Sequence, residues 1–261
     1  MSEENKSLIG VDAPSFMSQE DLNSGCGAEG AAKHIIPSRV KIVQSNAKKP
    51  YSELFNEGDV ILTPGKHLVC PAGGFFTFTP VYFFTEYCLV NPYKTAGTLP
   101  MIRERSLDEN SEIAKRCENL ESITCPELPS EKCKYKKFLN FLVRIYNSPG
   151  GDFPCLLSFS GGEYKYGSNF LGMLLGAQKM YTRNFSAMPN SHENPGNEWI
   201  GLDVINPPGD SGFGPWVTDE NWYKTSKRFF EQFTEDRHSI LADYEDSEEV
   251  QPAEADTGEF N

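Results

Sequence analysis

The chain has 261 residues, of which 38% are apolar, enough for one large domain or two small ones with a real core. The formal net charge is −13, but the acid is concentrated at the two ends of the sequence. Residues 243–261 carry eight carboxylates and no Lys or Arg, and residues 1–25 carry five acids against one Lys. Residues 26–242 hold 24 acids and 23 bases, which excludes attraction of polyanions by overall charge, so any such site must be a local patch.

The first residues predict a mobile, exposed start in a reducing compartment. Residues 1–30 are rich in Ser, Gly, Asn and acid, which is typical of a mobile N-terminal arm, and they lack the basic start and apolar core of a secretory signal. The seven cysteines are odd in number and form no Cys-x-x-Cys pair, so we expect reduced thiols and a cytoplasmic location. The most apolar run, 75–90, is interrupted by threonines, Pro80 and Glu86, so we expect no membrane anchor.

The rest of the chain predicts a mostly β domain with some α, spanning residues 31–242. Alternating or continuous apolar runs indicate strands at 39–44, 59–63, 75–90, 136–147, 154–160 and 198–206, with the third either one long strand or two strands bent at Pro80. Helical spacing occurs at 107–120, 168–180 and 218–233, the last with Thr218 as its expected N-cap. The polar, Pro-rich segment 91–134 indicates an excursion from the sheet. Without a βαβ rhythm, the order favours a small barrel or sandwich with insertions.

Strand 136–147 has two faces that differ in chemistry. Alternation places Lys137, Leu139, Phe141, Val143 and Ile145 on a core side, and Lys136, Phe138, Asn140, Leu142, Arg144 and Tyr146 on the other. The second side mixes cations with aromatic rings. Single-stranded nucleic acid requires this mixture, because cations follow the phosphates while flat rings stack on unpaired bases.

Neighbouring segments repeat the basic and aromatic theme. Run 75–90 is expected to present Phe76, Phe78, Tyr82 and Phe84 on one face. The complete set of candidate nucleic-acid contacts is Arg39, Lys41, Lys132, Lys134, Lys136, Phe138, Arg144, Tyr146, Tyr164, Lys165 and Tyr166. The alternative interpretation is that Phe138 and Tyr146 pack under the excursion 91–134 and that the lysines are ordinary solvated surface.

With these features, the sequence resembles phage-encoded single-stranded-DNA-binding proteins. The resemblance rests on the strand order, the basic and aromatic strand face, the segment PCLLSFSGGEYKYGSNFLGMLLG (154–176) and the acidic tail 243–261 with Phe260 near its end. It implies an OB-fold core and a disordered tail that competes with DNA and recruits polymerase, helicase or nuclease partners. The implied partner contacts are Glu248, Glu249, Asp256, Glu259 and Phe260, although Asn261 follows the aromatic residue on which many family members end.

Other functions are weaker interpretations of the sequence. The stretch GDSGFGP (209–215) resembles a serine-protease nucleophile segment, with Ser211 and His34, but no segment supplies the orienting acid. Cys117, Cys125 and Cys133 lack the close spacing of zinc ligands, and the three tryptophans are expected to be core. We therefore expect a non-enzymatic protein without cofactor or metal that coats single-stranded DNA in replication or recombination, in the bacterial host cytoplasm if phage-encoded. The alternative is an interaction or structural protein, such as a virion component or transcription cofactor, whose tail binds a partner.

Overall fold

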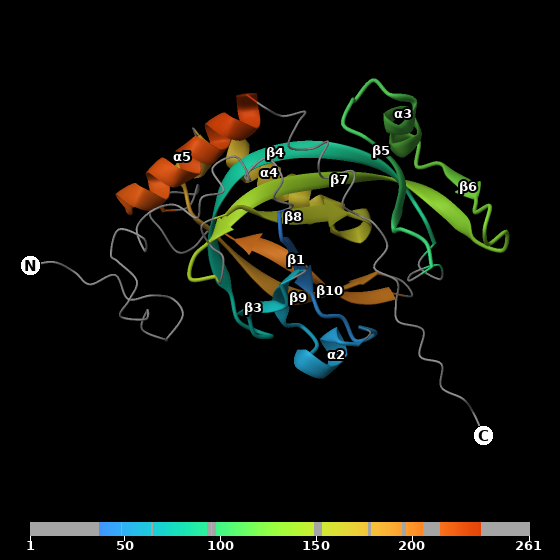
Figure 1. Cartoon of the computed structure of the whole chain (residues 1–261), viewed down its shortest axis with the longest axis horizontal. Helices are drawn as coiled ribbons and strands as arrows, with labels where there is room; N and C mark the ends of the chain where they lie inside the picture. The colour runs from blue at the N-terminus through green and yellow to red at the C-terminus, as the bar shows by residue number, and fades with distance from the viewer. Residues whose placement is uncertain are drawn as a thin grey trace, which may run out of the picture. The chain divides into compact units, whose positions relative to one another are not determined.

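Figure 1 shows the computed structural model of the chain. The structure describes residues 37–235 except 48, 64, 93, 94, 96, 97, 149–152, 177, 178, 195, 196 and 206–214. All of these residues belong to one of the two compact units of the chain, the unit Ile36–Asn261. The predicted arm 1–30, the acidic tail 243–261 with its five candidate partner contacts, and Ser211 and His34 lie outside the described residues.

The described residues form one ten-stranded mixed sheet. The path through the sheet is β10-β9-β4-β7-β8-β1-β2-β3, with β5 paired to β4 and β6 paired to β7. Only β1 and β8 pair in parallel along this path. The strands are β1 (Arg39–Ile42), β2 (Val60–Thr63), β3 (His67–Cys70), β4 (Phe76–Val90), β5 (Ile102–Ser106), β6 (Ser122–Thr124), β7 (Lys132–Ile145), β8 (Cys155–Ser160), β9 (Phe185–Asn194) and β10 (Asn197–Ile205).

Four α-helices and two short 3-10 turns accompany this sheet within the described residues. They are α2 (Tyr51–Leu54), α3 (Glu112–Glu118), α4 (Tyr164–Gly176), α5 (Glu220–Glu235), η3 (Gly161–Glu163) and η4 (Met180–Thr182). The prediction of a mostly β fold with added helices is confirmed. The expected N-cap of α5 is wrong by one residue, because the Asp219 carboxylate, not Thr218, accepts the backbone N–H of Trp222.

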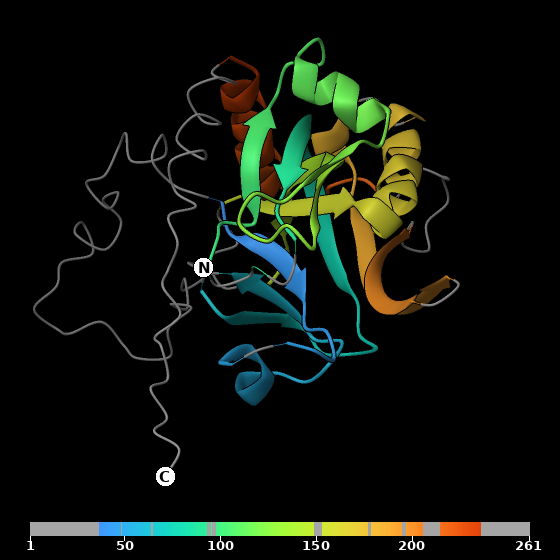
Figure 2. The same cartoon turned by 90° about the vertical axis from the view of Figure 1, so that its right-hand side faces the viewer.

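One face of the sheet, here called the inner face, surrounds the main core. Leu139, Phe141, Val143 and Ile145 of β7 contribute to this core, as the alternation predicted, and α4 inserts Phe170 among them. The sheet path itself stays open, because it ends at β10 and β3. In Figure 2 the β9–β10 hairpin, in orange, is sharply bent. It approaches the end of β1, where the Gln44 side-chain amide donates to the Ile200 carbonyl and accepts its N–H.

A β-bulge divides β4 into two parts of opposite side-chain parity. The register against β7 shifts between Pro80 and Tyr82, so that Val81 is an extra residue. Phe76 and Phe78 consequently belong to the inner core, whereas Tyr82 and Phe84 after the bulge lie on the other face, here called the outer face. The prediction that Phe76, Phe78, Tyr82 and Phe84 share one face is therefore wrong, because a one-residue insertion exchanges the two sides of a strand.

Helix α5 covers the outer face next to this bulge. Phe229 and Phe233 of the helix pack with Val81, Phe84, Leu142 and Leu156. Figure 1 shows α5, in orange-red, lying beside β4. The apolar stripe of α5 thus finds its partner on the outer side of β4, β7 and β8.

Candidate nucleic-acid interface

The outer face of β7, predicted to be the open binding face, is mostly covered. Phe138 is 8% exposed and Arg144 is 2% exposed, and Asn140 and Leu142 are also buried. The assignment of Phe138 and Arg144 as solvent-facing contacts is therefore wrong for this packing. Alternation shows which side chains share a face, but not what lies over that face.

The C-terminal end of β7, here called the far end of the outer face, holds a three-layer stack that attaches α5 to the sheet. The indole of Trp222 lies 3.7 Å from the Arg144 guanidinium and 4.1 Å from the Tyr146 ring, with an angle of 18° between the two rings. Arg144 and Tyr146 are two residues apart on one strand face, about 7 Å along the strand, so the indole fits between them. The Nη1 atom of Arg144 also donates hydrogen bonds to the Trp222 carbonyl at 2.8 Å and to Ser226 Oγ at 3.0 Å.

Hydrogen bonds complete this attachment of α5. Trp222 Nε1 donates to Thr79 Oγ1, and Thr79 in turn donates to Asn184 Oδ1, which also accepts from the Tyr146 hydroxyl. Burial raises the pKa of Tyr146 above its ordinary value. Tyr146 therefore packs under α5, not under the excursion 91–134 as the alternative interpretation proposed.

The middle of the outer face is filled from the excursion. Phe138 packs with Cys88, Val90 and Ile102, the last of which belongs to β5. Beside it, the Asn140 amide donates to Glu86 Oε2 at 3.0 Å, and Glu86 Oε1 lies 3.3 Å from Arg105 Nη1. For Phe138 the alternative interpretation is thus the correct one, and the nearby buried carboxylate has a cation and an amide as partners.

The N-terminal end of β7, here called its near end, stays accessible and carries three lysines. Lys132 and Lys134 are exposed, and Lys136 is half-buried. They alternate along the strand on one face, about 7 Å apart. Burial lowers the pKa of Lys136, and the charge of Lys134 lowers it further. None of the salt bridges formed among the described residues includes any of these three lysines.

Two further predicted cations lie on the outer face two strands away. Arg39 of β1 is half-buried and pairs in register with Leu156 of β8, and Lys41 is exposed. Because Val40 and Ile42 pack on the inner core, Arg39 and Lys41 point to the opposite side. The structure thus brings Lys132, Lys134 and Lys136 together and places Arg39 and Lys41 across β8 on the same side of the sheet.

The predicted group at 164–166 has different surroundings, at the start of α4. Tyr164 and Tyr166 pack partly against the inner core, and the Tyr166 hydroxyl lies 2.7 Å from His192 Nδ1. Lys165 is exposed, with its ammonium 4.7 Å from the Tyr166 ring. These residues form the first turn of α4, and they do not join the β7 lysines.

Sequence reasoning missed a polar cluster where the β9–β10 hairpin meets α4. His192 Nε2 lies 3.4 Å from Asp203 Oδ1, and Gly201 leaves the space that the His192 ring and the Glu163 carboxyl occupy. Burial raises the pKa of Glu163 from its ordinary 4.5 to about 7. These residues come from the β9–β10 hairpin and from η3, about 30 residues earlier, and share no motif, so no sequence signal marks them.

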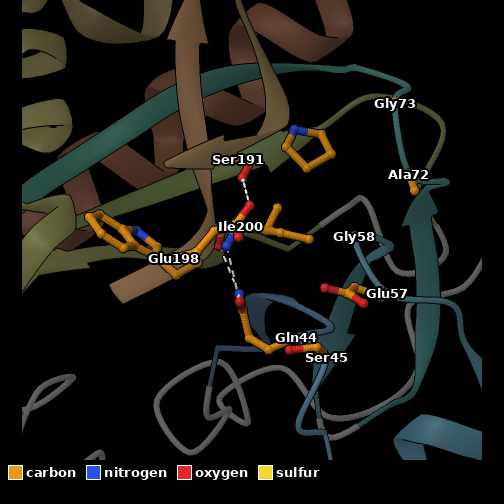
Figure 3. A pocket seen from close by; sticks show the side chains of 11 residues that line it. Gln44, Ser45, Glu57, Gly58, Ala72, Gly73, Ser191, Glu198 and Ile200 are labelled. Carbon is orange, nitrogen blue, oxygen red and sulfur yellow. Dashed lines mark hydrogen bonds between the residues drawn. The ribbon is translucent and has the colours of Figure 1, made fainter. Parts of the chain in front are cut away.

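A cavity of about 340 Å³ lies beside the Gln44 bridge (Figure 3). Glu57 and Glu198 contribute carboxylates to its lining, and Ser191 Oγ donates to Glu198 Oε1 at 2.8 Å. Among the residues that the structure describes, no Lys or Arg lines this cavity, so the charge of this lining is unsuitable for phosphate. A second cavity of about 220 Å³, lined by Lys41 and Glu163, lies on the other side of Gln44.

Trp216 is another feature that sequence reasoning missed. It was expected to be core, but its side chain is 50% exposed. Its ring lies against the guanidinium of Arg183. The expectation that all three tryptophans are core is therefore wrong for Trp216.

The three comparisons, with protein-family models, with curated proteins and with solved structures, find no match to the chain. Cys117, Cys125 and Cys133 are buried around α3, and no three His, Cys, Asp or Glu side chains gather as a metal site in the part of the chain that the structure describes. None of the helices in that part has the length and apolar character needed to cross a membrane.

Proposed function

We propose that this protein binds single-stranded DNA without catalysis, through the exposed near end of β7. The basic strip is formed by Lys132, Lys134 and Lys136. Arg39 and Lys41 lie apart from it, two strands away, because Arg39 is level with Leu142 of β7. A curved sheet around one core is compatible with an OB-type barrel, which is part of this proposal. The function is coating of single strands during replication or recombination in the cytoplasm.

The observation that carries the proposal is the environment of Lys136. Its ammonium is half-buried beside Lys134, and none of the described carboxylates pairs with either group. Desolvation and a like charge both make a cation unfavourable, and an anion placed between the two ammonium groups relieves both costs. A phosphate group supplies that anion.

The spacing of the strip favours a flexible chain of phosphates over a single anion. Three ammonium groups recur at every second residue of a strand, and a single strand of nucleic acid can adjust its backbone to such a row. Because the body of the protein is nearly neutral, binding relies on these few contacts. Affinity should therefore fall with salt at about 0.7 in log K per log salt for each phosphate contact.

The experiment compares two double variants with equal charge change in the full chain. Lys134→Gln with Lys136→Gln removes the strip, whereas Lys66→Gln with Lys115→Gln removes two exposed lysines from elsewhere on the surface. Oligo(dT) titrations across a salt series should show the first variant with weaker binding and a salt slope flatter by about 1.4, and the second close to wild type. Equal behaviour of the two variants would refute the proposed site.

The acidic tail completes the proposal. Its eight carboxylates resemble a weak phosphate chain, so the tail competes with DNA for the strip. When DNA displaces the tail, Phe260 and the neighbouring acids Glu248, Glu249, Asp256 and Glu259 become free to recruit replication proteins.

A further inference from the structure

The backbone on both sides of Trp216 is fixed to the segment before β9. Trp216 forms an isolated β-bridge with Arg183. The Asn184 N–H donates to the Pro215 carbonyl at 2.9 Å, and the Val217 N–H donates to the Thr182 carbonyl at 3.0 Å. These bonds hold Trp216 in place although half of its side chain meets solvent.

Arg183 covers one face of the Trp216 ring. The Arg183 guanidinium carbon lies 3.1 Å from the ring centroid, and Arg183 itself is buried. At this distance the guanidinium is stacked on the indole. Because that face is closed and the residue is still 50% exposed, we attribute the exposed area to the opposite face and the edge of the ring.

The stack at Trp222 shows what is missing at Trp216. Both indoles lie on a buried arginine, but Trp222 is closed on its second side by Tyr146 at 4.1 Å. Within the described residues, no aromatic ring stacks on Trp216. The Trp216 stack thus has the arginine layer and the indole layer of the Trp222 stack but lacks the third, aromatic layer.

From this comparison we infer that Trp216 is a stacking platform for one unpaired nucleobase. A nucleobase on the open face of Trp216 would take the place that the Tyr146 ring has at Trp222, as the third layer after the arginine and the indole. Arg183 and the two backbone bonds fix the indole beforehand, so little conformational entropy is lost on binding. The exposed Lys179, which precedes η4, has its ammonium 5.3 Å from the Phe230 ring of α5.

This inference rests on the proposed function and adds a stacking contact near the Tyr146 end of β7, where Asn184 joins Pro215 to Tyr146. Stacking is not a charge interaction, so its loss lowers affinity without altering the salt slope. Trp216→Ala should weaken oligo(dT) binding by about fivefold to a hundredfold, with the slope unchanged. Trp216→Phe, which keeps a flat ring, should recover part of that loss.

Phe75→Ala is the matched control, because Phe75 is 67% exposed and has no cation stacked beneath it among the described residues. Each variant is titrated with oligo(dT) and with an abasic strand of the same length, after its melting temperature has been checked. Wild type and Trp216→Ala should differ on the first strand and bind the second equally. Trp216→Phe keeps the test valid if the Ala variant folds poorly.

The outcomes separate this inference from the proposed function. If wild type binds oligo(dT) but Trp216→Ala binds it equally well, or loses as much on the abasic strand, the stacking platform is refuted and the β7 strip stands. An equal loss in Phe75→Ala also refutes it. If wild type binds no single strand at low salt, the proposed function fails and the platform fails with it.

Discussion

Replacing Arg144 by Met tests whether this buried cation holds α5 to the sheet or contacts DNA. Met keeps most of the apolar stem but removes the bonds from Nη1 to the Trp222 carbonyl and to Ser226 Oγ, and the stack on the indole at 3.7 Å. Hydrogen bonds from a charged group contribute about 1.5 to 3 kcal/mol each, and a desolvated cation–π contact contributes about 2 kcal/mol. These terms share one side chain, and desolvation of the guanidinium opposes them. We therefore expect the free energy of unfolding to fall by about 2 to 4 kcal/mol.

The assay is urea denaturation followed by Trp emission, in parallel with oligo(dT) titrations across a salt series. Lys134→Met is the matched control, because Lys134 is exposed on the same strand and its loss should change stability by less than about 0.5 kcal/mol. Arg144→Met should unfold at lower urea concentration while the salt slope of DNA binding stays unchanged. Lys134→Met should keep its stability but show a flatter salt slope. An Arg144→Met variant of normal stability with a flatter slope would refute the packing argument and restore Arg144 as a phosphate contact.

Three further predictions concern the hairpin cluster and the tail. Gly201→Ala should destabilise the fold by about 1 to 3 kcal/mol in chemical denaturation, because a Cβ there would lie 2.5 Å from His192 Cδ2; unchanged stability would contradict the packing. Burial raises the pKa of Glu163 to about 7, so the folded state keeps a proton that the unfolded state releases above its ordinary pKa of 4.5, and stability falls as pH rises from about 5 to 7. At about 1.4 kcal/mol per pKa unit, Glu163→Gln should gain at most about 3 kcal/mol on wild type over this range, and a pH-independent difference would oppose this. Deleting residues 243–261 should raise affinity for oligo(dT), most at low salt because the Debye length is about 10 Å at 0.1 M, whereas Phe260→Ala should leave it nearly unchanged; equal affinity of wild type and deletion at every salt would contradict competition.

The parts of the fold that were predictable are those set by local alternation. The inner side of β7 followed directly from the apolar residues at every second position, because one buried face requires that period. The outer side did not, because its cover comes from α5, more than 70 residues later in the sequence. Leu142, an apolar residue on the supposedly open side, was the local sign of that cover.

Strand β9 was missed because Pro189 and its polar neighbours lack a strand signature. The structure shows why the proline is tolerated. The backbone N–H and C=O of Ile200 bond to Gln44 and point away from β9. In an antiparallel pair the backbone groups of Leu202, two residues on, therefore also point away from β9. Pro189 is its register partner, and the missing N–H therefore removes no bond of this ladder. Such compatibility depends on pairing that a single sequence does not reveal.

The candidate site was predictable only in part, for a related reason. Lysine clusters are evident in any sequence, and three at the start of β7 do remain accessible. Which aromatic rings face solvent is decided by distant elements, so Phe138 and Tyr146 are packed while Trp216 is exposed. The bulge at Val81 likewise changes the face of every later residue in β4 through one unpaired position.

The most direct test of the proposed function is lysine footprinting of the full chain with and without oligo(dT). An amine-reactive reagent labels neutral lysine side chains, and the lowered pKa of Lys136 increases its neutral fraction. Bound oligo(dT) should protect Lys132, Lys134 and Lys136 from labelling, while the labelling of Lys66 and Lys115 should stay unchanged. Labelling of the three β7 lysines that DNA leaves unaltered, at a concentration where the oligomer is bound, would contradict it.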